Sequence, residues 1–159
     1  MAELRKVRIT AMEAMAEVIV QTVEQGGQAK FTVTGNSMYP IFRSDMDSVF
    51  VARPGRLRLF DVILYRRADG AYVLHRIVGR ARGAFVLCGD GQTELEYGVT
   101  PGMVLAVVTA FERGGRRVSV RAPWYRLYAA LWCLVRPLRF PILTALRRVK
   151  RRFVKGRCV

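Results

Sequence analysis

Residues 31–111 form a succession of short β-type runs, and this pattern constrains the fold more than any other feature of the chain. The runs are rich in β-branched and aromatic residues, and Gly, Pro and Asp cluster between them without an intervening helical pattern. Short strands at such close intervals are typical of antiparallel sheets, so we expect a mainly β domain. The expected strands are Phe31–Val33, Val49–Val51, Val62–Tyr65, Tyr72–Leu74, Ala84–Leu87 and Val104–Val108, with a hairpin turn at residues 66–70.

An amphipathic helix is expected before the first strand. Thr10 and Glu13 have the spacing of a capping box, which opens a helix, and the glycine pair 26–27 would end it. The expected helix carries a stripe of apolar residues. The stripe can pack on the core of the β domain or bind a membrane surface, and we favour packing. Acidic residues interrupt every apolar run, so a transmembrane span is not expected here. The stripe consists of Met12, Met15, Ile19 and Val23, which recur at helical spacing.

The positive charge of the protein is concentrated at its C-terminal end. Residues 121–159 carry 11 Lys and Arg and no acidic residue, so the net charge of +15 falls to +4 when this segment is subtracted. The basic character therefore belongs to this segment and not to the whole protein, which argues against nucleic acid as the main partner.

The same C-terminal segment is rich in aromatic residues and leucine up to residue 146 and then reaches a basic cluster at 147–152. Its longest uncharged run, Leu127–Val135, is far shorter than the roughly 20 residues that cross a bilayer. Three interpretations are open: a helix lying in the membrane interface and attracted to anionic lipid, a helical hairpin packed on the β domain, and a nucleic-acid-binding tail. We favour the membrane interface.

The cysteine and histidine content argues against a metal site. Three cysteines at irregular spacing (Cys88, Cys133 and Cys158) and a single histidine make no zinc-binding pattern, so we expect no metal and no cofactor. The cysteines are expected to be free thiols in a reducing compartment. Glu13 and Glu17 interrupt the stretch that follows the N-terminal basic residues, so no cleavable signal peptide is expected. We therefore expect a location on the cytoplasmic side of a membrane rather than export.

Ser37 and His75 are the residues that best fit catalytic chemistry. Ser37 lies in a glycine-containing turn, residues 34–40, directly after an expected strand. A serine hydroxyl is a poor nucleophile until a base accepts its proton. His75 is the only histidine and follows the strand run at 72–74, and an imidazole can accept a proton at neutral pH and return it to a leaving amine. Taken alone, such a pair is a weak signal.

Short motifs surround this pair in a fixed order along the chain. They are Gly35-x-Ser37-Met38-x-Pro40, Asp47-x-Val49, Leu59-x-Asp61-Val62, His75-Arg76-Ile77 and Gly89-Asp90. The ordered set resembles the type I signal peptidase superfamily, specifically its endoplasmic-reticulum and archaeal branch, which uses histidine where the bacterial branch uses lysine. The resemblance covers about residues 31–111, roughly half of the chain.

The resemblance implies a role for particular residues. It implies that Ser37 attacks the scissile carbonyl, that His75 is the general base, and that an acid orients the imidazole and stabilises its charged form. Asp90 matches the family in residue type, whereas Glu96 matches in position but replaces the usual Asp. The choice between Asp90 and Glu96 stays open.

Other positions depart from the family pattern. Signal peptidases tend to have Ser-Gly before Ser-Met, whereas Gly35-Asn36 precedes Ser37, which is closer to the self-cleaving SOS-type repressors of the same superfamily. This departure leaves the side-chain donor of the oxyanion hole open, while the backbone N–H of Ser37 is still expected to serve there. Asn36 and Met38 are the expected substrate-binding residues.

The expected organisation is an N-terminal helix at 1–30, a signal-peptidase-like catalytic domain at 31–120 and a basic, aromatic-rich helical tail at 121–159. The expected function is a serine endopeptidase that cleaves signal or leader peptides by acyl transfer, with the substrate laid beside a sheet edge. Two alternatives use the same fold: a regulator akin to the self-cleaving repressors, and a catalytically silent protein that binds a membrane surface. The expected partners are a peptide or preprotein substrate and, through residues 122–159, a membrane surface.

Overall fold

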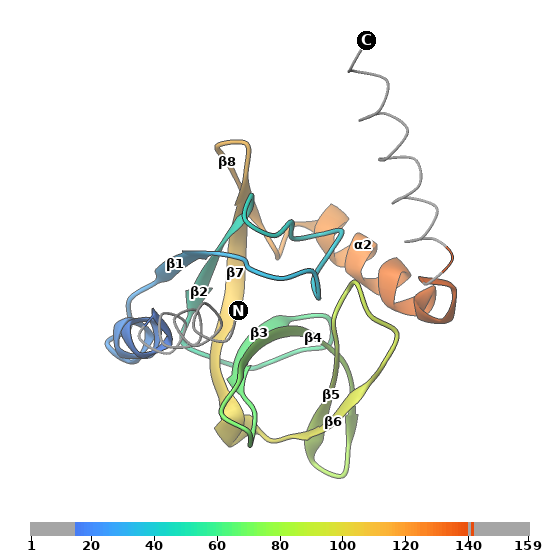
Figure 1. The fold of residues 1–159 in the computed structure, drawn as a ribbon, viewed down its shortest axis with the longest axis horizontal. Helices are drawn as coiled ribbons and strands as arrows, with labels where there is room; N and C mark the ends of the chain where they lie inside the picture. Colours follow the sequence, from blue (N-terminus) through green and yellow to red (C-terminus); the bar gives the residue numbers. More distant parts are fainter. Residues whose placement is uncertain (1–14, 140, 142–159) are drawn as a thin grey trace, which may run out of the picture.

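The structure is a computed structural model that describes residues 15–139 and 141. The capping box Thr10–Glu13, Met12, the basic cluster 147–152 and Cys158 lie outside the described residues. The described part confirms the expected fold class, because it is a mainly antiparallel sheet with a helix before it and a helical segment after it (Figure 1).

Eight strands make up the sheet, and each of the six expected runs falls on one of them. Two short strands, β6 and β8, were not expected from the sequence. The strands are β1 (Ala29–Thr32), β2 (Ser48–Ala52), β3 (Val62–Arg66), β4 (Tyr72–Ala81), β5 (Ala84–Cys88), β6 (Glu96–Val99), β7 (Val104–Arg113) and β8 (Arg116–Ser119), with the 3-10 helix η1 (Pro101–Met103) before β7.

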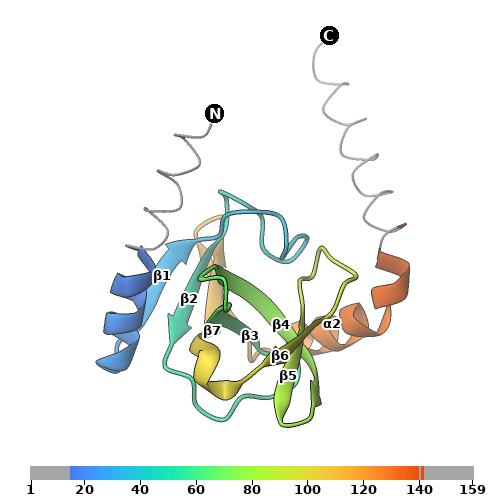
Figure 2. The ribbon, with the colours of Figure 1, turned by 60° about the horizontal axis from the view of Figure 1, so that its bottom comes forward.

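The sheet is strongly curved. Its order is β1-β2-β7-β3-β4-β5-β6, with β8 paired to β7, and all neighbouring strands are antiparallel. Register shifts interrupt several of the pairings, and such irregularities bend strands and increase their twist. Strands β3 to β6 accordingly curl round on themselves (Figures 1 and 2).

The hairpin between β3 and β4 sets the position of His75. Arg67 N donates to Ala71 O at 2.9 Å, which confirms the turn expected at residues 66–70. The register that follows pairs Ile63 with His75 and Tyr65 with Val73. Because paired residues lie on the same face of a sheet, Tyr65 and His75 become diagonal neighbours on one face.

The apolar core has two parts on either side of the curl. The larger part combines side chains of the N-terminal helix, the loop after β1, and strands β2, β3 and β7. The smaller part lies among β3, β4, β5 and β6. The serine-bearing loop therefore rests on the larger core.

The N-terminal helix, described over residues 15–24, packs on the larger core through Ile19 and Val23. It ends at the expected glycine pair: Gly26 has a φ of 80°, and Gly27 N donates to Thr22 O at 2.9 Å, which is the Schellman pattern. The core-packing interpretation of the apolar stripe is thereby confirmed for its described residues.

The C-terminal segment begins with α2 (Pro123–Leu134) and the 3-10 helix η2 (Arg136–Leu138). Tyr125 and Ala129 are buried, so the described part of this segment packs on the domain at the end opposite the N-terminal helix (Figures 1 and 2). Among the described residues no helix has both the length and the apolar character needed to cross a membrane.

Candidate active site

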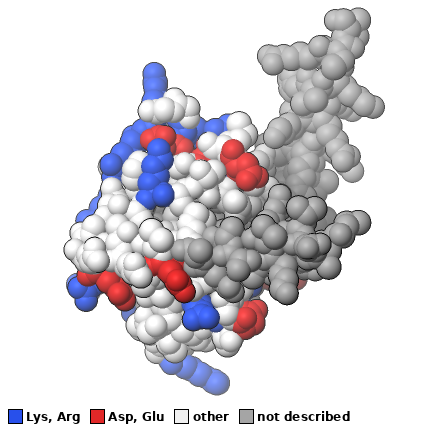
Figure 3. All heavy atoms as spheres, turned by 60° about the vertical axis from the view of Figure 1, so that its left-hand side comes forward, with Lys and Arg blue, Asp and Glu red and all other residues white. Residues whose placement is uncertain are grey.

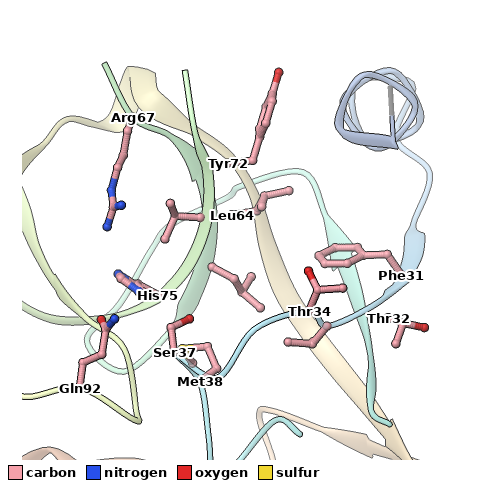
Figure 4. Close-up of a pocket in the computed structure, with 13 residues that line it drawn as sticks. Phe31, Thr32, Thr34, Ser37, Met38, Leu64, Arg67, Tyr72, His75 and Gln92 are labelled. Atoms are coloured by element: carbon pink, nitrogen blue, oxygen red, sulfur yellow. The ribbon is translucent and has the colours of Figure 1, made fainter. Parts of the chain in front are cut away.

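A pocket of about 250 Å³ lies between the chain that leaves β1 and the first half of β4 (Figure 4). Residues 31–34, Ser37 and Met38 line it from the first segment, and residues 72–75 line it from β4. The structure thus brings Ser37 and His75, which are 38 positions apart in the sequence numbering, to one cavity.

A closed loop, residues 33–47, carries Ser37. Val33 N donates to Asp47 O at 3.0 Å and Asp45 N donates to Val33 O at 2.8 Å, so the two ends of the loop are joined. Met38 is 1% exposed and belongs to the larger core, while it also lines the pocket. The residue after the serine is therefore an apolar anchor of the loop and part of the cavity wall at once.

Asp47 fixes the far end of the same loop. Its carboxylate is fully buried and accepts hydrogen bonds from Arg43 Nη2 at 2.8 Å and from Arg113 Nη2 at 2.7 Å. Burial alone would raise the pKa of Asp47, but the hydrogen bonds from these two arginines hold that pKa well below its usual range. Asp47 therefore supports the loop and takes no part in the pocket.

A second loop, residues 89–92, lies against the backbone of Ser37. Gly91 N donates to Ser37 O at 2.7 Å. A Cβ atom on Gly89 would lie 2.5 Å from Ser37 O, and one on Gly91 would lie 2.6 Å from Asn36 O. Since real Cβ atoms are not found at such distances, both positions need glycine for the two loops to meet.

Asp90 directs its carboxylate to Arg76 rather than to His75. Arg76 Nε donates to Oδ1 at 2.8 Å and Nη2 donates to Oδ2 at 2.5 Å, and both side chains are fully buried. Arg76 also donates to Phe60 O and to the hydroxyl of Tyr125. Asp90 therefore joins the second loop to β4 and α2.

Glu96 is the acid that reaches His75. Its Oε2 lies 3.5 Å from His75 Nδ1, and the hydroxyl of Tyr65 donates to the same oxygen at 2.5 Å. Arg67 donates to both carboxylate oxygens, at 2.7 and 2.6 Å. The hydrogen bonds from Arg67 lower the pKa of Glu96, so this carboxyl is ionised at neutral pH.

The tautomer of His75 follows from these contacts. The hydroxyl of Tyr65 has one hydrogen and donates it to Glu96, so its oxygen, 3.3 Å from His75 Nδ1, can only accept. The proton of the neutral imidazole is therefore assigned to Nδ1, which leaves the lone pair on Nε2. Burial lowers the pKa of His75, although the charge of Glu96 opposes this, so the ring is neutral at neutral pH. A general base needs this protonation state.

Ser37 and His75 lie beside each other at one end of the pocket, with Gln92 next to them (Figure 4). Within the described residues no hydrogen bond joins the two side chains.

Two other expected site residues do not line the pocket. Asn36 is exposed and does not line the pocket, and Asp90 is turned away from His75. Three lining or supporting residues, Tyr65, Arg67 and Gln92, were not expected. The hairpin at 66–70 was the available signal for Tyr65, because its register already places that side chain diagonally opposite His75.

Comparisons with known proteins leave the function to be inferred from this site. No family model matches the chain, no curated protein matches it, and no solved structure matches it.

Proposed function

We propose that this protein is a serine endopeptidase that cleaves signal or leader peptides by acyl transfer, with Ser37 as nucleophile and His75 as general base. The proposal rests on one observation: the cluster of Tyr65 and Glu96 at Nδ1 orients a neutral imidazole in the pocket that also holds Ser37. A base that is itself oriented by a third group is the arrangement of serine-histidine-acid triads.

The reaction proceeds in two stages. Ser37 Oγ attacks the scissile carbonyl carbon while His75 Nε2 accepts the hydroxyl proton, and the carboxylate of Glu96 stabilises the imidazolium that forms. His75 then gives this proton to the leaving amine, and the C–N bond breaks to leave an ester on Ser37. Water attacks the ester with His75 again as base, which releases the acid product and restores the serine.

The substrate is proposed to bind as an extended segment. Strand β1 is an edge strand of the sheet, and residues 72–75 of β4 come before the part of β4 that pairs with β5. Within the described sheet, each of the two segments that line the pocket therefore has one backbone edge without a strand partner. A peptide can add to such an edge as a further strand. Apolar side chains such as Met38, Leu64 and Leu74 line the pocket, which favours small uncharged side chains near the scissile bond.

We further place the enzyme at a membrane surface, on its cytoplasmic side, with residues 122–159 as the attachment. Peptides of this class present their cleavage sites close to the bilayer. Figure 3 shows the face of the molecule that carries β1, where Lys and Arg gather over the upper part of the visible surface beside a few acidic residues. The concentration of Lys and Arg without any acidic residue at 121–159 supports the C-terminal segment as the attachment.

Cleavage of a panel of signal-peptide-like and leader-like substrates tests the proposed activity. Wild type, Ser37→Ala, His75→Ala and the control Ser48→Ala, a serine on β2 outside the pocket, are compared after folding is checked by circular dichroism. We expect losses of about 10³-fold or more for Ser37→Ala and His75→Ala and wild-type rates for Ser48→Ala. Equal cleavage by wild type and Ser37→Ala contradicts the proposal. Cleavage of the chain by itself favours the self-cleaving regulator, and no cleavage at all favours the silent protein.

A further inference from the structure

Helix α2 is apolar on two opposite faces, and the domain covers only one of them. Tyr125 is 1% exposed and Ala129 is 0% exposed, and Trp132 Nε1 donates to Asp90 O at 2.9 Å, so this face is fixed against the domain. A helix that is apolar all round normally has both faces covered. The uncovered face, called here the α2 stripe, consists of Trp124 (55% exposed), Leu127 (62%), Leu131 (53%) and Leu134 (77%), and Leu138 (58%) in η2 extends it.

A pocket of about 310 Å³ lies at the N-terminal end of α2 and is lined mainly by arginine. Its lining residues, called here the arginine pocket, are Arg56, Arg58, Arg121, Arg126 and Asp61. Asp61 Oδ1 accepts a hydrogen bond from Arg126 Nη1 at 2.8 Å, and Asp61 Oδ2 accepts one from Arg58 N. Across residues 15–139, the guanidinium groups of the other three arginines form no ion pair, so one cavity holds three uncompensated positive charges.

The α2 stripe and the arginine pocket share helix α2. Arg126 belongs to both α2 and the pocket, and its Nη2 donates to the carbonyl of Leu59, which is itself 45% exposed. Apolar side chains beside arginines are the composition of a helix that lies in the membrane interface, where leucine and tryptophan enter the acyl boundary and arginine meets phosphate. The guanidinium group binds phosphate oxygens in pairs, which suits a lipid headgroup.

We propose that the α2 stripe and the arginine pocket together dock this protein on an anionic phospholipid surface, with lipid phosphate entering the arginine pocket. This inference rests on the membrane attachment proposed above and specifies the surface that makes it. A second copy of the chain is a poorer occupant, because residues 121–139 contain no acidic residue that could neutralise the pocket of a partner. A phosphate supplies that counter-charge directly.

Vesicle flotation with the full chain tests the inference. The vesicles are pure phosphatidylcholine, or phosphatidylcholine with about one-third phosphatidylglycerol. Leu127→Ser with Leu131→Ser removes half of the α2 stripe, Arg56→Gln with Arg58→Gln removes two charges of the arginine pocket, and Arg116→Gln with Arg117→Gln on β8 is the charge-matched control. We expect binding only to the anionic vesicles, a loss of about tenfold or more in affinity for each of the first two double variants, and a change below about twofold for the control.

The possible results separate this inference from the proposals on which it rests. If the wild-type protein does not bind anionic vesicles, both the membrane attachment and this docking surface are wrong. Binding that both double variants retain at wild-type strength overturns this surface alone. If Leu127→Ser with Leu131→Ser binds vesicles as wild type does but no longer forms a concentration-dependent dimer, the α2 stripe is assigned to a second copy of the chain. If the protein binds inorganic phosphate but not vesicles, the arginine pocket is assigned to a free anion. Cleavage of a soluble peptide by the same variants stays at the wild-type rate if the peptidase assignment holds.

Discussion

At the residue scale, the protonation states of three neighbouring groups in the site have different causes. Burial, together with the hydrogen bond to Glu96, raises the pKa of Tyr65, so its hydroxyl stays a donor. The hydrogen bonds from Arg67 lower the pKa of Glu96 and keep it ionised. Burial lowers the pKa of His75 and keeps the imidazole neutral. The result is a donor, an anion and a base next to one another at neutral pH.

Replacing Glu96 by Gln tests the role of this anion. The substitution keeps the shape of the side chain but removes the charge that stabilises the imidazolium, so we expect kcat to fall by about 10²- to 10³-fold with little change in KM. Glu94→Gln is the matched control, because Glu94 is exposed and does not line the pocket. Steady-state kinetics on the best substrate of the panel measures both. A Glu96→Gln variant with wild-type kcat removes Glu96 from the proposed mechanism.

The pH dependence of kcat/KM reports the base itself. A protonated imidazole cannot accept the serine proton, so activity falls as pH drops through the pKa of His75 in the free enzyme. Because burial disfavours the charged ring, this inflection is expected below 6.5, with a plateau at neutral pH. Measuring kcat/KM from about pH 5 to 8 gives the inflection. An inflection above 6.5 contradicts the environment described for His75.

At the element scale, the site is made where two loops and one hairpin meet. The loop 33–47 carries Ser37, the β3–β4 hairpin carries His75, and the loop 89–92 holds the first loop through the bond from Gly91 N to Ser37 O. Trp132 and Arg139 of the C-terminal segment in turn donate to the carbonyls of residues 89–92. The position of Ser37 therefore depends on elements spread over most of the described chain.

Substitution of Gly91 by Ala tests this dependence. The added Cβ would meet Asn36 O at 2.6 Å and Tyr39 O at 3.1 Å, both backbone atoms, so the two loops must move apart. We expect a loss of at least about tenfold in kcat/KM, since small misplacements of catalytic groups are costly. Gly102→Ala in η1 is the control, because a Cβ there has open space. Equal kcat/KM for Gly91→Ala and wild type, with both folded, shows that the loop contact does not position Ser37.

Local sequence patterns were sufficient to predict the elements that are marked by an apolar run or by glycine. The six expected strands have β-branched runs, and the helix end at 26–27 has its glycine pair. Strands β6 and β8 lack such runs, with sequences Glu-Tyr-Gly-Val and Arg-Arg-Val-Ser, and form by pairing with β5 and β7. Propensity could not have identified them, because tertiary pairing determines their structure.

The choice between Asp90 and Glu96 illustrates what could not be predicted about the site from the sequence alone. Both acids lie close together in sequence, but β6 pairs Glu96 with Leu87, and β5 pairs Leu87 with Ile77, two residues from His75. That row of cross-strand neighbours brings Glu96 to the imidazole. In the sequence, Glu96 was one of two candidates, favoured by its position but not by its residue type, and the register of three strands decides between them.

At the scale of the whole molecule, the two terminal segments serve different parts of the protein. The N-terminal helix closes the larger core behind β1 and β2, whereas α2 supports the loop 89–92 with one face and leaves the other uncovered. The C-terminal segment is thus part of the folded domain as far as the structure describes it. The surface proposed for lipid and the site proposed for peptide cleavage therefore belong to one folded domain.

Mass spectrometry of a trapped acyl group tests whether Ser37 is the nucleophile. The full chain is mixed with an activated ester of a good substrate peptide, quenched in acid and digested to locate any acyl group. We expect one acyl group on Ser37 in wild type, far slower acylation in His75→Ala, and none in Ser37→Ala. An acyl group that forms equally fast in Ser37→Ala, or that lies on another residue of the wild type, contradicts the assignment of Ser37 as the nucleophile.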